Sequence, residues 1–282
     1  MNRKGITLIE LLVALTISAI LVAGIYRTFI HQQHTYTVQD QVVDMQQNVR
    51  LAINRMTREL RMAGYGKMDA GFFGKVGGKG GGKVHGSFED VVTPGGGGTS
   101  VTVVGGYQTL TTLSANANIG SNTIQVNDAT GIDLVKKQYI SINGVESHQI
   151  NKITGNQIEF KGGETLSENH LAGEPVYLVM AITYSHGVPG DPLRGVPGDP
   201  LLRDDNLGLV PAQPVAENVE NLQFAYFDAN GNPTANPPDI RMIQLTIIAR
   251  TDKIDPELAK AGDGFRRRTL TTNIQLRNLA FL

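Results

Sequence analysis

An apolar stretch near the N-terminus, interrupted by one carboxylate, constrains this chain more than any other feature of its sequence. The run from Ile6 to Tyr26 is 21 residues long, and Glu10 is its one charged side chain. As a helix it is about 31 Å long, enough to cross a bilayer. An ionised side chain in a membrane helix costs about 2.5–3.5 kcal/mol on insertion scales, so a carboxylate there points to a function. Glu10 therefore requires a positively charged partner.

The residues before the run suggest where that charge comes from. Arg3 and Lys4 precede Gly5, and basic residues at this end of a span favour a cytoplasmic N-terminus, although Arg27 at the other end weakens the bias. If the peptide bond after Gly5 is cut, Ile6 carries a new N-terminal ammonium. Glu10 is then close to the mature N-terminus and can meet such a cation.

The stretch Gly5–Val13 (GITLIELLV) resembles the class III signal of type IV pilins and pseudopilins. The resemblance implies that a prepilin peptidase cuts after Gly5 and methylates the amine of Ile6, and that Glu10 serves assembly. Ile6 departs from the Phe that the family favours at this position. A simple membrane anchor is a second interpretation, but it leaves Gly5 and Glu10 unexplained. An ordinary secretory signal, the third, has a shorter apolar core and a small-x-small cleavage site.

The helical pattern continues beyond the apolar run. Apolar residues recur at spacings of three and four, which is typical of a helix with one buried face. This stripe consists of Val38, Val42, Met45, Val49, Ala52, Met56, Leu60 and Ala63. We predict one helix from about Ile6 to about Ala63, ended by Gly64 and Gly66. Residues 1–5 are then a leader, 6–26 the transmembrane or filament-core half, and 27–63 an amphipathic half that packs on a head.

The middle of the chain divides into a connector and a β-rich region. Residues 64–100 are rich in glycine and are expected to form a connector or surface loop. Within them Gly77–Lys83 has the bare spelling of a phosphate-binding loop, but Val84 replaces the metal-binding Ser or Thr, so a plain loop is favoured. Residues 101–180 contain short strand patterns and form a β-rich insertion. Hairpin turns are predicted at Asn143-Gly144 and Gly155-Asn156.

The last third predicts the antiparallel sheet of the head, residues 181–282. Residues 187–202 are a tandem duplication with two prolines per copy, which we interpret as an elongated surface loop. Residues 221–227, 241–250 and 269–277 alternate between apolar and polar positions, which indicates a half-buried sheet. The chain is therefore assigned to the α+β class, and the resemblance of Gly5–Val13 implies a type IV pilin fold. Segments 201–205, 215–226, 244–250 and 276–278 also resemble the PilW group of minor pilins.

Few residues suggest chemistry. His31 and His34 lie one helical turn apart without a nearby third ligand, so a solvated helix face is favoured over a metal site. The order Asp228, Asn230, Asn232, Asp239 is similar to a calcium loop, but Pro233 stands where glycine is required, and a strand-connecting turn is favoured. Arg266–Arg268 is interpreted as a solvated strand edge. A net charge of −1 argues against nucleic-acid binding, and with no cysteine there are no thiolate metal sites. No enzymatic activity, cofactor or metal is expected.

These observations and the resemblance lead to one main expectation and two alternatives. The main expectation is a minor pilin of a type IV pilus, anchored in the inner membrane with a periplasmic head and then moved into the pilus at the cell surface. Its expected partners are prepilin peptidase, other minor pilins, the major pilin and a tip adhesin. The first alternative is a GspJ-like minor pseudopilin of a type II secretion system. The second is a membrane-tethered periplasmic binding module, in which Glu10 has no explanation.

Overall fold

The computed structural model describes residues 8–65, 90–132, 138–187, 200–206 and 211–279. The chain divides into two compact units, and each is described by itself. Unit 1 contains residues 1–47 and 251–266; unit 2 contains residues 48–250 and 267–282.

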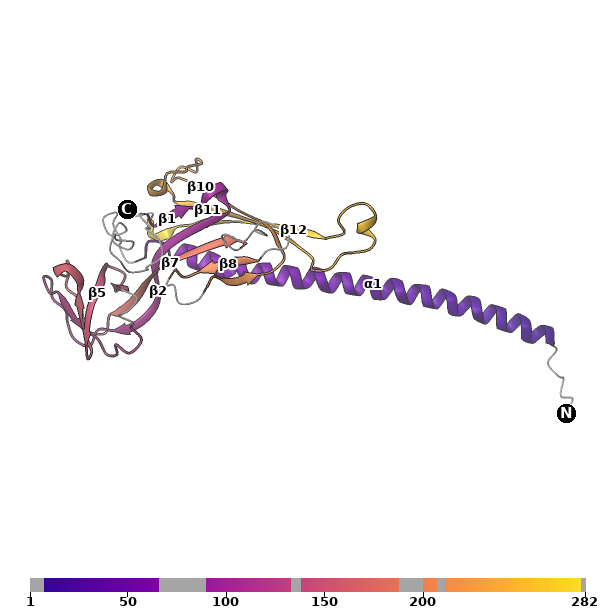
Figure 1. Cartoon of the computed structure of the whole chain (residues 1–282), viewed down its shortest axis with the longest axis horizontal. Helices are drawn as coiled ribbons and strands as arrows, with labels where there is room; N and C mark the ends of the chain where they lie inside the picture. Colours follow the sequence, from indigo (N-terminus) through magenta and orange to yellow (C-terminus); the bar gives the residue numbers. More distant parts are fainter. Residues whose placement is uncertain (1–7, 66–89, 133–137, 188–199, 207–210, 280–282) are drawn as a thin grey trace. The chain divides into compact units, whose positions relative to one another are not determined.

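One long helix, α1 (Leu8–Arg61), forms the N-terminal part of the described chain (Figure 1). Its last turn tightens, since the amides of Met62 and Ala63 bond to carbonyls three residues back. Gly64 then adopts a φ of 76°, and its amide donates to the Val104 carbonyl. The helix thus ends two residues before the predicted position, through the glycine that the sequence indicated.

The predicted apolar stripe lies on the buried face of α1. Val38 and Val42 are half-buried, and every later member of the stripe is buried. Leu51, on another face, is exposed. The C-terminal end of the helix is also held by a distant side chain, because the Asn278 amide donates to the carbonyls of Arg61 and Ala63. Burial of the stripe from Val49 onward and capping from the C-terminal segment together attach the end of α1 to the head within unit 2.

The larger sheet is built around one long strand. The strands along its path are β1 (Val92–Pro94), β2 (Ser100–Thr112), β7 (Pro175–His186), β4 (Tyr139–Ile142), β5 (Glu146–Thr154), β6 (Gln157–Phe160) and β3 (Thr123–Gln125), with β8 (Leu201–Asp204) and β9 (Gln213–Ala216) beside them. Strand β7 pairs along one edge with β2 and along the other with β4 and then β8, all antiparallel. Figure 1 shows β7 between β2 and β8. It therefore links the β-rich region to the rest of the head.

The sequence-based divisions of the middle region need three corrections. Strand β7 runs across position 180/181, where the insertion is predicted to end. Its first half pairs with β4 and its second half with β8, so one strand belongs to both regions. Strand β1 lies within the expected connector 64–100, where Val92 is buried against the long strand β2. Leu201 and Leu202, the last residues of the tandem duplication, are buried in β8 because they come after its final proline. The rest of the duplication, 188–199, lies outside the described residues.

The two predicted hairpin turns are confirmed. Asn143 and Gly144 have φ values of 51° and 71° between β4 and β5, as a type I′ turn requires. Gly155, with a φ of 58°, begins the turn between β5 and β6. Beyond these turns a buried apolar cluster fills the β-rich region, with members that include Leu113, Ile158 and Phe160. This region is called the β subdomain (residues 113–176) below.

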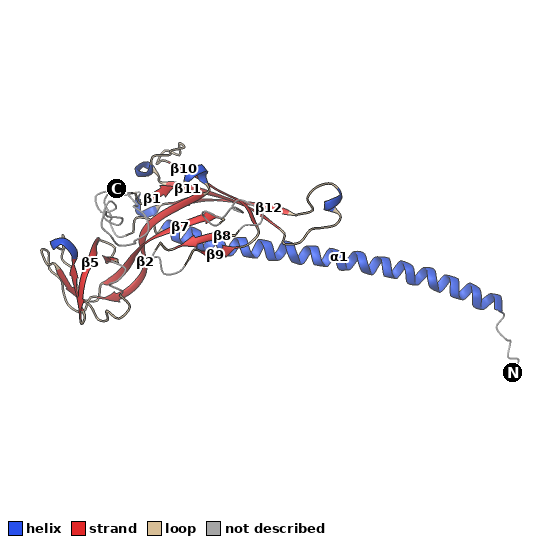
Figure 2. Cartoon of the chain, viewed as in Figure 1, coloured by secondary structure: helices blue, strands red, loops and turns tan. Residues whose placement is uncertain are grey.

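A second sheet contains β10 (Val219–Phe227), β11 (Met242–Arg250) and β12 (Arg267–Gln275). Figure 2 marks these strands, together with short 3₁₀ turns, at Gly96–Gly98, Lys161–Gly163, Pro237–Asp239, Leu258–Lys260 and Arg277–Leu279. Burial alternates along β11, where Ile243, Leu245 and Ile247 are fully buried and their neighbours are half-exposed. The predicted α+β class, with one long N-terminal helix and antiparallel sheets, is confirmed.

Candidate functional site: the N-terminal helix and the polar clusters of the head

The first half of α1 presents an apolar surface to its surroundings. From Leu8 to Ile30 its large apolar side chains are exposed. Among the described residues α1 is the one helix long and apolar enough to cross a membrane, with a mean hydropathy of 2.5 in its most apolar window. Glu10 lies in the first turn of this helix and is exposed to the same surroundings.

Two threonine hydroxyl groups on this surface are satisfied within the helix. Thr16 donates to the carbonyls of Leu12 and Val13, and Thr28 donates to the carbonyl of Gly24. An unsatisfied hydroxyl in hydrocarbon is costly, and such bonds to the preceding turn remove that cost. These two threonines are therefore compatible with lipid or with a packed filament core. The predicted processing residues Gly5 and Ile6 lie outside the described residues, as does Gly77–Lys83.

A buried ion pair connects the second half of α1 to the larger sheet. Glu59 accepts hydrogen bonds from Arg203 Nε at 2.9 and 3.2 Å and from the Tyr184 hydroxyl at 2.5 Å. Burial first, and then the charge of Glu59, raises the pKa of Tyr184 well above its usual range. Arg203 lies on β8, and its partner is 144 residues away in sequence. Sequence patterns therefore did not reveal the pair.

A second buried polar group lies in the β subdomain. Glu146 on β5 accepts hydrogen bonds from His170 Nε2 at 2.7 Å, His148 Nε2 at 3.0 Å and the Ser167 amide at 2.8 Å. The Ser167 hydroxyl and the Glu168 amide also donate to it. Burial by itself would raise the pKa of Glu146, but these hydrogen bonds outweigh it and lower the pKa from 4.5 to about 2. Glu146 is thus a carboxylate throughout the ordinary pH range.

The Nδ1 atoms of both imidazoles, His148 and His170, also face carboxylates. His170 Nδ1 lies 2.8 Å from Glu174 Oε2, and His148 Nδ1 lies 3.4 Å from Glu164 Oε2. His148 also stacks on Phe160. We call Glu146, His148, Glu164, His170 and Glu174 the Glu146 cluster. Despite its two imidazoles, no group of three ligands in the described part of the chain is arranged to hold a metal ion. Its members are scattered over 29 positions, from Glu146 to Glu174, so no short motif marked it.

Of the histidine pair on α1, His34 lies beside one carboxylate, and no third ligand joins them among the described residues. His34 Nε2 lies 3.4 Å from Asp255 Oδ1, within unit 1. Asp255 is buried and also accepts two hydrogen bonds from the Arg266 guanidinium, which lower the pKa of this carboxyl. The expected solvated face is therefore wrong for His34, because the segment 251–266 supplies a carboxylate beside it. His31 is exposed.

The arginine run near β12 is partly paired rather than wholly solvated. Arg266 binds Asp255, Arg267 binds Glu220 on β10, and Arg268 is exposed. The expected solvated edge thus holds for Arg268, while the other two cations meet carboxylates that the sequence did not place beside them.

The predicted turn at Asp228 closes on itself. Asp228 Oδ1 accepts the amides of Asn230 and Asn232 at 2.8 Å, and Asp239 is bonded instead by the Asn236 amide group. The backbone hydrogen bond from Asn232 is the main cause that lowers the pKa of Asp228. Its oxygens are therefore used by the loop, as a strand-connecting turn requires.

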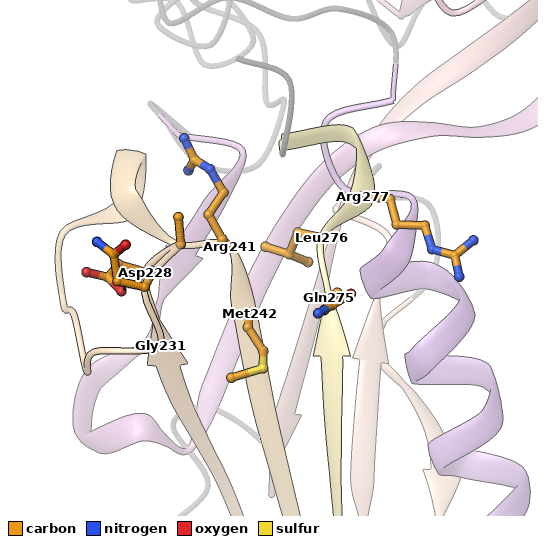
Figure 3. A pocket seen from close by; sticks show the side chains of 9 residues that line it. Asp228, Gly231, Arg241, Met242, Gln275, Leu276 and Arg277 are labelled. Carbon is orange, nitrogen blue, oxygen red and sulfur yellow. Dashed lines mark hydrogen bonds between the residues drawn. The ribbon is translucent and has the colours of Figure 1, made fainter.

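A pocket of about 700 Å³ lies beside this turn and includes Met242, Gln275 and Arg277 in its lining. In Figure 3 the side chains of Arg241 and Arg277 point away from each other. Arg241 donates to the carbonyls of Pro238 and Ile240. The pocket therefore has no converging set of charged groups among its lining residues.

Comparison with known proteins gives two similarities. Residues 1–26 match the prokaryotic N-terminal methylation motif. A solved type IV-like pilin from Thermus thermophilus is similar at 14% identity and a TM-score of 0.36, covering 83% of this chain and 95% of its own. No curated protein matches the chain. The N-terminus thus carries a prepilin-type signal of the kind that prepilin peptidases process, which agrees with the resemblance drawn from Gly5–Val13.

Proposed function

We propose that this chain is a minor pilin of a type IV pilus. The observation that carries the proposal is the exposed apolar half of α1, which begins within the N-terminal methylation motif and bears Glu10 in its first turn. In this proposal the membrane and then the filament core cover the apolar surface in succession. The head folds on the second half of the same helix, so extraction of the helix from the membrane carries the head into the filament.

Processing is the first step of the proposed function. Prepilin peptidase cuts after Gly5 on the cytoplasmic side and methylates the amine of Ile6. Because the cut removes only the basic leader, the apolar span stays in the inner membrane with the head in the periplasm. The new ammonium supplies the positive charge that a carboxylate in a low-dielectric environment requires.

Glu10 sets the register in the assembled state. Its carboxylate meets the ammonium of Ile6 from a neighbouring subunit, either the major pilin's equivalent or that of another minor pilin. A buried charge that loses its partner costs about 3–5 kcal/mol. A subunit without the carboxylate is therefore disfavoured in the filament, although it still enters the membrane.

The experiment compares Glu10→Ala and Glu10→Gln with the wild-type chain in cells. We expect normal cleavage in both variants, seen as a methylated Ile6 N-terminus by mass spectrometry, and at least a tenfold loss of the subunit from sheared pili. Thr16→Val is the matched control, since its hydroxyl bonds only to its own helix. Normal incorporation of the Glu10 variants would refute the proposed role of Glu10.

Deletion of the gene and the state of the N-terminus distinguish the alternatives. Loss of pili on deletion of the gene, with co-purification of pilus subunits or a tip adhesin, supports the minor pilin. Loss of protein secretion with intact pili would instead indicate a GspJ-like pseudopilin. A functional protein that keeps Met1 would overturn both and indicate a tethered binding module.

A further inference from the structure

The loop between β11 and β12, residues 251–266, lies against α1 within unit 1 and is called the β11–β12 loop below. The two meet at His34, whose Nε2 atom is 3.4 Å from Asp255 Oδ1, and Figure 1 shows the loop beside the helix. Asp255 is buried, and its other oxygen accepts hydrogen bonds from Arg266 at 3.1 and 2.7 Å. This carboxylate therefore holds the loop at one height along α1.

Helical geometry gives the height of this contact above a membrane. A helix rises about 1.5 Å per residue and the hydrocarbon core is about 30 Å thick, so about 20 residues cross it. The crossing segment ends near Tyr26 if it begins at Ile6, and at Ile30 if it begins at Leu11. His34 is then about 6–12 Å beyond the hydrocarbon core. Since the headgroup layer is about 5–8 Å thick, the loop lies beside or within its reach.

The loop exposes two large apolar side chains close to this contact. Ile254, which precedes the buried Asp255, is 55% exposed, and Leu258 is 38% exposed. Outside α1, the described part of the chain exposes only two other large apolar side chains, Ile119 and Leu171. Single exposed apolar residues are ordinary on protein surfaces. Here two of them lie within five positions, on the loop that is held beside the end of the membrane span.

The loop holds its apolar side chains in a closed conformation. The Asp255 amide donates to the Gly264 carbonyl at 2.8 Å, and the Ala259 amide donates to the Asp255 carbonyl at 2.9 Å. Gly264 has a φ of 80°, and a Cβ there would lie 2.4 Å from Ile254 Cγ2 and 3.1 Å from Ala259 Cβ. Ile254 and the turn Leu258–Lys260 therefore meet over this glycine. Because the loop is already ordered, little conformational freedom is lost when it meets another surface.

We propose that the β11–β12 loop docks through Ile254 and Leu258 on the surface of the bilayer that α1 crosses. The inference rests on the membrane-spanning state in the proposed function and adds a second membrane contact to it. The bilayer is the occupant because the span places it within reach of the loop in every copy, whether or not another subunit is present. Entry into a filament then has to break this contact as well as extract the helix.

The proposed contact is apolar rather than ionic. The loop contains three cations and four carboxylates, so it has no excess of positive charge to attract anionic lipid. Lys253 and Lys260 are exposed beside the two apolar positions. Their aliphatic stems can follow the apolar side chains while the ammonium groups stay among the headgroups. Docking should therefore occur on phosphatidylcholine alone.

The test measures how close Leu258 comes to the lipid headgroups. The chain contains no cysteine, so one introduced cysteine can be labelled without background. A fluorophore is attached to Leu258→Cys in single full-length chains in phosphatidylcholine nanodiscs, and its quenching by a nitroxide on the headgroup is recorded. Phe29→Cys, at the end of the span, is the positive control. Val43→Cys is the negative control, since it lies about 20–26 Å beyond the hydrocarbon on the same helix.

We expect quenching at Leu258 to exceed that at Val43 at least twofold and to approach that at Phe29. Equal quenching at Leu258 and Val43, with Phe29 quenched, would overturn the proposal and leave the proposed function intact. An unquenched Phe29 would show instead that α1 does not cross the bilayer, which contradicts the proposed function itself. A Leu258 label that is unquenched in nanodiscs but immobilised in sheared pili would show that a neighbouring subunit covers the loop, and would also overturn the proposal.

Two substitutions of Leu258 separate docking from a purely structural role. Leu258→Asp places a charge at the bilayer surface, whereas Leu258→Trp supplies a side chain that favours the membrane interface. In nanodiscs we expect amide-exchange protection of peptides within 252–263 to fall about fivefold in the first variant and to be kept or raised in the second. Val43→Asp is the matched control and should leave this protection unchanged. Equal losses in the two Leu258 variants would contradict docking on lipid.

Discussion

Arg203→Met tests whether the buried ion pair with Glu59 holds α1 to the larger sheet of unit 2. The side chains of Glu59 and Arg203 are 12% and 15% exposed, so both charges are largely removed from water. The substitution keeps an unbranched side chain of similar length but deletes the guanidinium. The Glu59 carboxylate then remains on the buried side of the helix with the Tyr184 hydroxyl as its main donor.

The expected cost follows from that environment. Removal of one partner from a buried pair costs about 3–5 kcal/mol. Because Tyr184 still donates to the carboxylate, we expect the lower end, about 3 kcal/mol of unfolding free energy. Glu59→Gln keeps an acceptor for Tyr184 and should cost about 2 kcal/mol. The double variant leaves no unpaired charge, so it should also cost about 2 kcal/mol, which gives a coupling of about 3 kcal/mol between the two residues.

The assay is urea unfolding of the full chain in detergent, followed by circular dichroism. Arg55→Met is the matched control: Arg55 lies 3.4 Å from the same carboxylate, but its side chain is 47% exposed. Such an exposed pair contributes less than about 1 kcal/mol. Equal losses of unfolding free energy in Arg55→Met and Arg203→Met would refute the argument that burial makes the Glu59–Arg203 pair important. Additive costs in the double variant would refute it as well.

Two further predictions concern the core and the response to acid. Met56→Ala should lower the unfolding free energy by about 2–5 kcal/mol, because Met56 is fully buried on the helix stripe. Leu51→Ala, at a position that is 70% exposed, should lower it by less than about 0.5 kcal/mol. Similar urea midpoints for the two variants would contradict the assigned buried face of α1. Hydrogen bonds lower the pKa of Glu146 from 4.5 in the unfolded chain to about 2 in the folded chain. Its contribution of about 3 kcal/mol is therefore present above pH 4.5 and is lost as pH falls toward 2. Glu146→Gln should therefore already be destabilised at pH 7 and show a weaker loss on acidification, measured by urea midpoints from pH 7 to pH 2.5.

Local patterns in the sequence determined the helix and strands, their buried faces and the hairpin turns. The spacing of three and four from Val38 to Ala63 identified the buried face of α1, because helical geometry places such residues on one side. Alternation identified the faces of β10 and β11 for the corresponding reason. The turn at Asn143-Gly144 was predicted from two residues, since few others adopt two successive positive φ values. Each of these properties depends on neighbours within a few positions.

Only the tertiary structure decided which charged groups meet. Glu59 and Arg203, and His34 and Asp255, are far apart in sequence, and nothing local distinguishes them from exposed residues of the same types. Their pairing depends on how β7, β8 and the segment 251–266 are placed, which is a property of the whole packed chain. Electrostatic energy depends on distance and burial in space, so periodicity along the chain identified the elements but could not identify the Glu146 cluster.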